Sequence, residues 1–158
     1  MIPQKLTVVL LRQALLLILI VSLVGSGIEL LLLHHTDGIW QLLPLLLIAL
    51  AFGVLAWFGL SRSSASIRTL QVVMLLCLAS GAVGLVQHFS GNLVYASESN
   101  PSLSGMALYK EALFGSTPTL APGTMIQVGL LGLAFAFRHP SLRGPDPGGE
   151  HPSQRTLA

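Results

Sequence analysis

Charged side chains are scarce in this sequence. Only 9% of its 158 residues are Asp, Glu, Lys or Arg, whereas a soluble domain carries roughly a quarter. Apolar residues make up 53% of the chain. The formal charge of +2 comes from basic residues scattered between apolar blocks, which argues against a nucleic-acid-binding patch. We therefore expect a protein whose surface faces lipid and which binds no nucleic acid.

Cysteine and the common catalytic motifs are also nearly absent. The single cysteine, Cys77, lies inside an apolar block, so one chain cannot form a disulfide framework or a multi-cysteine metal site. The sequence has no glycine-rich phosphate loop after a strand and no nucleophile–base motif. We expect a protein without catalytic activity and predict no cofactor.

Four long apolar blocks dominate what is present. They span residues 13–33, 39–60, 69–89 and 120–137, and each approaches the roughly 20 residues needed to cross a hydrocarbon core about 30 Å thick. Blocks of this length satisfy their backbone hydrogen bonds as helices, whereas barrel strands are shorter and alternate in polarity. The sequence predicts an all-α integral membrane protein with four transmembrane helices in an antiparallel bundle.

The first block has features of a secretory signal peptide. Lys5 and Arg12 precede an apolar run, and Gly25-Ser26-Gly27 supplies small residues. However, the apolar run continues to Leu33, which is longer than a typical signal core. We expect this block to be a retained first span.

The connections between the spans differ in length. Residues 34–38 and 61–68 are short enough to form tight hairpins, with Thr36 or Asp37 as the expected cap of the second helix. The connection 90–119 is too long for a simple turn. Within it, residues 104–114 have the pattern of a short helix lying on the membrane or on the bundle.

Basic residues near the span ends predict the orientation. One side carries seven of them, and the other has only Lys110; the seven are Lys5, Arg12, Arg62, Arg68, Arg138, Arg143 and Arg155. Because basic residues stay in the cytoplasm, residues 1–12 should form a cytoplasmic N-terminus, residues 13–137 the transmembrane domain and residues 138–158 a disordered cytoplasmic tail. We expect a multi-pass protein of a bacterial cytoplasmic membrane.

Each span carries small residues along one helical face, which we call its small-residue stripe. Such stripes let helices approach closely in lipid. In chain order they are Ser22, Gly25, Ser26 and Glu29; Ala49, Gly53 and Ala56; Cys77, Ser80, Gly81 and Gly84; and Gly129, Gly132 and Ala136. We expect the stripes of spans 13–33 and 69–89 to face each other, although any one of them suits a partner's helix equally well.

Polar residues gather near the outer ends of the first and third spans. Glu29 is the only carboxylate inside a span, and such a group is costly in hydrocarbon unless it is paired, protonated or wet. Gln87 and His88 should lie at a comparable depth. The simplest interpretation is a helix-packing polar cluster of Glu29, Gln87 and His88 that fixes the helix register.

Two alternative interpretations use the same region. One alternative is a transition-metal site, because imidazole and carboxylate groups are suitable ligands; its candidate residues are Glu29, His34, His35 and His88. Histidines from two helices could also bind haem. Glu29 and His88 in a wet pocket would instead suit a proton-coupled transport component.

These features lead to a functional expectation. We expect a non-catalytic small subunit or accessory protein of a larger membrane complex, with the lipid bilayer and other membrane subunits or a second copy as its partners. The alternatives are an outer-face metal- or haem-binding membrane protein and a small proton-coupled transport component.

Overall fold

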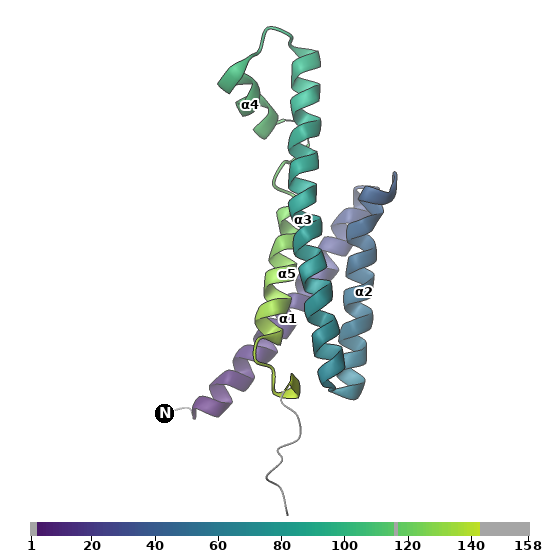
Figure 1. Cartoon of the computed structure of the whole chain (residues 1–158), viewed down its shortest axis with the longest axis vertical. Coiled ribbons are helices and arrows are strands. Elements are labelled where there is room, and N and C mark those ends of the chain that lie inside the picture. Colours follow the sequence, from purple (N-terminus) through teal and green to yellow (C-terminus); the bar gives the residue numbers. More distant parts are fainter. Residues whose placement is uncertain (1–2, 116, 143–158) are drawn as a thin grey trace, which may run out of the picture.

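The computed structural model describes residues 3–115 and 117–142, and the regular structure of this part of the chain is all helical, with no strand. Three helices are long and apolar enough to cross a membrane: α1 (Gln4–Leu32), α2 (Ile39–Ser61) and α3 (Ser64–Ser99). Two shorter helices, α4 (Gly105–Leu113) and α5 (Gly123–Ala136), and the short 3-10 helix η1 (Pro140–Leu142) complete the described chain. Figure 1 shows α3 as the longest element, with α5 and α2 beside its lower part and α1 crossing obliquely.

The helices do not end where the sequence pattern placed the spans. α1 begins at Gln4, within the segment expected to precede the first span, and α3 continues ten residues past 89. The first third of the expected connection 90–119 is therefore helical. The short helix expected at 104–114 is present as α4, which packs against the upper part of α3.

The helix of the fourth apolar block is shorter than expected. α5 has 14 residues, which rise about 21 Å at 1.5 Å per residue. The hydrocarbon core is about 30 Å thick. The structure therefore contains three helices of spanning length among its described residues and one shorter apolar helix.

The two tight turns form by different local chemistry. Ser63 begins α3 as its N-cap, because its side chain accepts a hydrogen bond from the Ser66 backbone N–H at 3.2 Å. At the other turn, the expectation that Thr36 or Asp37 caps the second helix is wrong. Gly38 is the N-cap, at a φ of 111° that favours glycine, and the backbone N–H of Asp37 donates to Gln41 Oε1 at 2.9 Å.

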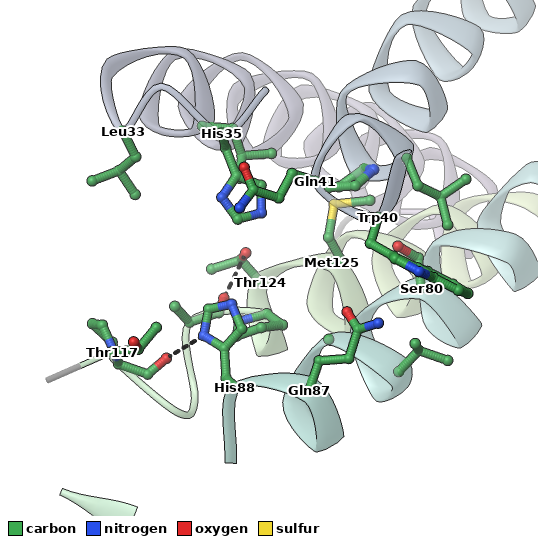
Figure 2. Close-up of a pocket in the computed structure, with 18 of the residues that line it drawn as sticks. Leu33, His35, Trp40, Gln41, Ser80, Gln87, His88, Thr117, Thr124 and Met125 are labelled. Carbon is green, nitrogen blue, oxygen red and sulfur yellow. Dashed lines mark hydrogen bonds between the residues drawn. The ribbon is translucent and has the colours of Figure 1, made fainter. Parts of the chain in front are cut away.

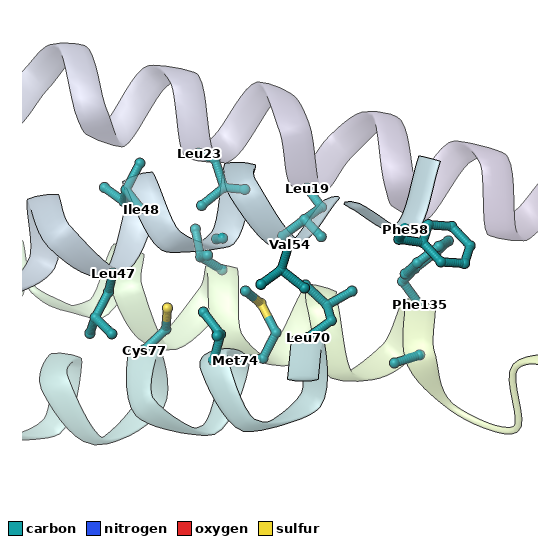
Figure 3. Close-up of a cluster of buried hydrophobic side chains, with 14 of the residues drawn as sticks. Leu19, Leu23, Leu47, Ile48, Val54, Phe58, Leu70, Met74, Cys77 and Phe135 are labelled. Atoms are coloured by element: carbon teal, nitrogen blue, oxygen red, sulfur yellow. The ribbon is translucent and has the colours of Figure 1, made fainter. Parts of the chain in front are cut away.

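The core runs between α1, α2, α3 and α5. Its buried side chains include Leu19 and Leu23 of α1, Val54 and Phe58 of α2, and Leu70, Met74 and Cys77 of α3, which Figure 3 shows converging. Cys77 is a buried core residue, as expected of a lone cysteine in an apolar block.

The closest helix pair is α3 with α5. A methyl group added at Gly81 would lie 2.8 Å from the Pro122 carbonyl oxygen, and one at Gly129 would lie 2.6 Å from the Met74 carbonyl oxygen. Both glycines therefore hold two backbones in direct contact. The small-residue stripe of the third span packs against that of the fourth block.

The expected pairing of the first and third stripes is thus wrong. α1 packs mainly on α5, and its Leu19 and Leu23 are fully buried. Of the predicted α1 stripe, Ser26 is buried, but Gly25 and Glu29 are exposed. Each stripe could be recognised in the sequence. The sequence did not show which two stripes pack together, because that depends on whether the glycines of two helices lie opposite each other.

Candidate functional site

A cavity of about 840 Å³ opens where α1 turns into α2, opposite the middle of α3 and the start of α5. Its walls come from the last turn of α1, the turn before α2, the first turns of α2, one face of α3 and the segment 117–125. This volume lies within the usual range for small-molecule sites, about 300–1,000 Å³. Figure 2 shows side chains from these segments pointing toward the same space.

Two imidazoles face each other across the cavity. The ring centroids of His35 and His88 are 6.5 Å apart, and Figure 2 shows the rings on opposite walls. His88 Nδ1 lies 3.0 Å from the Pro118 carbonyl oxygen. Because a carbonyl only accepts hydrogen bonds, His88 Nδ1 carries a proton and donates it in this contact.

His35 is held toward its neutral form. Burial, followed by the charge of His88, lowers the pKa of His35 below its ordinary value of 6.5. The ring is therefore uncharged at neutral pH.

Glu29 and Gln87 line the same cavity. In the described ranges, the Glu29 side chain forms no hydrogen bond or ion pair, and no hydrogen bond joins it to Gln87 or His88. The structure therefore brings the predicted polar cluster of Glu29, Gln87 and His88 to one cavity without direct pairing. The Glu29 side chain is exposed at the cavity wall and is not buried between helices.

The residues predicted for a metal are only partly gathered. Glu29, His35 and His88 line the cavity, but His34 does not. His34 has a φ of 50°, and its Nδ1 lies 3.1 Å from the Leu32 carbonyl oxygen. Across residues 3–115 and 117–142, no three His, Cys, Asp or Glu side chains lie close enough to hold a metal ion.

Asn92 is a structural residue that the sequence analysis missed. It is buried, and its Nδ2 donates to the carbonyl oxygens of Ala112 at 3.0 Å and Thr117 at 2.7 Å and to Thr119 Oγ1 at 3.1 Å. Its Oδ1 accepts from the Thr117 backbone N–H at 3.2 Å. Asn92 thereby fixes the end of α4 and the segment that closes the cavity.

His88 and Asn92 act on the same segment from one helical face. They are four residues apart on α3, so their side chains lie one above the other. His88 holds Pro118 while Asn92 holds Thr117 and Thr119. This i, i+4 spacing of two polar residues was the available sequence signal.

A second polar group of residues lies at the opposite end of the helices. Arg12 donates to the carbonyl oxygens of Phe135 at 3.1 Å, Phe137 at 3.1 Å and Arg138 at 3.0 Å. These contacts satisfy carbonyls at the end of α5 and place a positive charge at its negative dipole end. Burial, followed by the charges of Arg12 and Arg62, lowers the pKa of His139 at this end.

The whole chain was compared with known proteins. No protein-family model, curated protein or solved structure matches it.

Proposed function

We propose that this chain is a non-catalytic accessory subunit of a membrane complex, built as an antiparallel bundle of four spans. The observation that carries the proposal is a small-residue stripe that the fold leaves outside. Ala49, Gly53 and Ala56 of α2 are all exposed, and a methyl group added at Gly53 would meet no atom within 4 Å. The stripes of α3 and α5, in contrast, are occupied by each other.

An exposed stripe of this kind suits another transmembrane helix. Small residues permit close backbone approach in lipid, where van der Waals packing drives helix association. α1 also has a large open surface, since only 11% of its most apolar stretch is buried, compared with 28% for α2 and for α3. The partner is another membrane subunit or a second copy of this chain.

The short helix α5 can complete the fourth span because of its surroundings. Irregular backbone is tolerated at membrane depth where protein surrounds it. α5 is packed against both α3 and α1, and Arg12 satisfies carbonyls at its end. The segments before and after α5 would then supply the remaining height of the span.

The basic residues support an orientation with both ends in the cytoplasm, in a bacterial cytoplasmic membrane. Arg62 lies in the α2–α3 turn and Arg68 near the start of α3, and Arg12 reaches Arg138 at the same end of the bundle. Lys110 lies on α4, beyond the opposite end. This distribution follows the positive-inside rule, and it puts the cavity on the outer side.

The test is the mass of the protein purified in a mild nonionic detergent. Light scattering should give a particle whose protein mass exceeds the 16.7 kDa of one chain, and mass spectrometry should identify its components. Gly53→Leu should dissociate it. Gly59→Leu is the matched control, because Gly59 is also exposed and open but lies about 120° around α2 from Gly53. A monodisperse single chain without copurifying protein would refute the proposal.

The two alternatives have narrower support. A metal or haem site would rest on His35 and His88, and an absorption spectrum with elemental analysis of the purified protein tests it. A proton-coupled role would rest on Glu29 at the cavity wall, and unchanged proton flux in a Glu29→Gln variant would remove its main support.

A further inference from the structure

We infer that the cavity between the α1–α2 turn and α3 binds an amphiphile with a cationic ammonium head and a single alkyl chain. The head would lie near Glu29, and the chain would follow an apolar groove between α2 and α3. This inference goes beyond the subunit role. From the proposed function it takes only the location of the cavity at the outer membrane surface.

The charge of the cavity wall selects a cation. Glu29 and Asp37 both line it, and no lysine or arginine does. Neither carboxylate takes part in an ion pair in the described part of the chain, and His35 is neutral at ordinary pH. A phosphate or sulfate head would meet two negative charges and no compensating positive one, whereas an ammonium group complements both.

Aromatic and apolar walls suit the rest of such a ligand. Trp40 lines the cavity, and an indole face attracts ammonium groups. Leu30, Leu43 and Val83 also line it, so the polar groups occupy one part of a mainly apolar wall. This mixture is typical of sites that bury an apolar body and orient it by a few polar contacts.

A second, smaller hollow extends the site along the helices. It has a volume of about 210 Å³ and an almost entirely apolar wall, which includes Leu47, Leu76 and Ala79. Trp40, Leu43, Ser80 and Val83 line both hollows. The two are therefore adjacent, and the smaller one runs from the polar cavity toward the membrane interior between α2 and α3.

The shape and chemistry of the combined site match one class of ligand. A polar head site with uncompensated carboxylates opens at the surface, and an apolar groove leads down from it into the bilayer. An alkylammonium compound entering from the outer leaflet would place its charge and its chain in these two places at once.

The probe is 12-bromododecyl-trimethylammonium, whose bromine quenches nearby indoles, added to the protein in a nonionic detergent. Two single-tryptophan variants report binding: Trp57→Phe retains Trp40 at the cavity, and Trp40→Phe retains Trp57 at the other end of α2. We expect saturable quenching of Trp40 at probe concentrations that leave Trp57 unaffected. Equal quenching of both would indicate simple partitioning into the micelle and would overturn the inference.

Substitutions at the head site test the charge complementarity. Glu29→Gln in the Trp57→Phe background should weaken binding about tenfold, as expected for loss of one charged interaction. Asp37→Asn should act in the same direction. Glu98→Gln is the control, because Glu98 is an exposed carboxylate on α3 outside the cavity wall. Equal binding of 12-bromododecyl sulfate, or no effect of either cavity variant, would refute a cationic head site.

Filling the groove tests the alkyl chain independently. Ala79→Phe should weaken binding of the same probe, since Ala79 lines the groove. Ala82→Phe is the matched control, as Ala82 is exposed on α3 and lines neither hollow. Equal affinities of these two variants would overturn the placement of the chain. All readouts are independent of oligomeric state, so this inference and the subunit proposal can fail separately.

Discussion

The contact between α3 and α5 provides a sharp test of the fold. We predict that Gly81→Ala lowers the free energy of unfolding relative to Gly91→Ala, a substitution on the same helix. A methyl group at Gly81 would lie 2.7 Å from Ile126 Cγ1, 2.8 Å from the Pro122 carbonyl oxygen and 2.9 Å from the Ile126 backbone nitrogen. Two of these three atoms are backbone, so no side-chain rotation relieves the overlap.

The magnitude follows from the separation that the methyl group requires. Carbon atoms pack best at about 3.5–4.0 Å, so the two helices must move apart by several tenths of an ångström or more. Overpacking of this kind costs about 1–3 kcal/mol. Alanine also favours a helix over glycine by about 1 kcal/mol, and this gain applies equally to Gly91, where the methyl group meets nothing. Subtracting the two variants cancels the helix propensity and leaves about 1–3 kcal/mol.

The free energy of unfolding is to be measured by titrating the protein in nonionic micelles with sodium dodecyl sulfate, followed by circular dichroism. Gly129→Ala should behave like Gly81→Ala, because its methyl group would meet the Met74 carbonyl oxygen at 2.6 Å. If Gly81→Ala, Gly129→Ala and Gly91→Ala are equally stable, the close packing of α3 on α5 is incorrect.

Three further predictions address the ends of the bundle. Asn92→Ala should increase protease cleavage within residues 103–119, because the buried groups that Asn92 binds would lose their partner, at about 1–3 kcal/mol each. Asn100→Ala, at an exposed position, should leave this cleavage unchanged. Arg12→Met should lower the free energy of unfolding by about 1–3 kcal/mol, since three carbonyls at the end of α5 lose their donor. Arg12→Lys should restore only part of this free energy, because a lysine lacks the planar fork of the guanidinium group. Equal stability of both variants and the parent would contradict this role of Arg12. Acidification should destabilise the protein as the pH falls below about 6.5, because the folded state lowers the pKa of His139 and the unfolded chain therefore takes up the proton first. His139→Gln should reduce that decline in thermal melts between pH 7 and 5, and an unchanged decline would show that His139 does not contribute.

The helical segments and their apolar character could be predicted because they depend on local composition. Runs of leucine, isoleucine and valine without charges specify membrane helices wherever they pack. The short helix at 105–113 was also visible, from the recurrence of apolar residues at helical spacing. The predicted helix bounds were less accurate. The polar residues after 89 have no apolar pattern that extends the span, and they continue α3 because this part of the helix packs against α4.

The residues of the predicted polar cluster lie in one region of the structure, but their hydrogen bonds differ from those expected. The sequence indicated that Glu29, Gln87 and His88 share a depth, and all three line one cavity. It predicted that they bond to one another, yet His88 bonds instead to Pro118, thirty residues further along the chain. That contact depends on the segment after α4 folding back over α3, which no local pattern shows.

The amino-acid sequence by itself determined that this chain is helical and membrane-compatible, because scarcity of charge and long apolar runs act residue by residue. Only the tertiary structure decided that the glycines of α3 pack against those of α5, that the α2 stripe remains outside, and that Asn92 holds the segment that closes the cavity. The physical reason is that in lipid every apolar face is equally well solvated, so hydropathy does not select a partner. Close approach of matching glycines and the pairing of buried polar groups make that selection, and both depend on the three-dimensional positions of residues far apart in the chain.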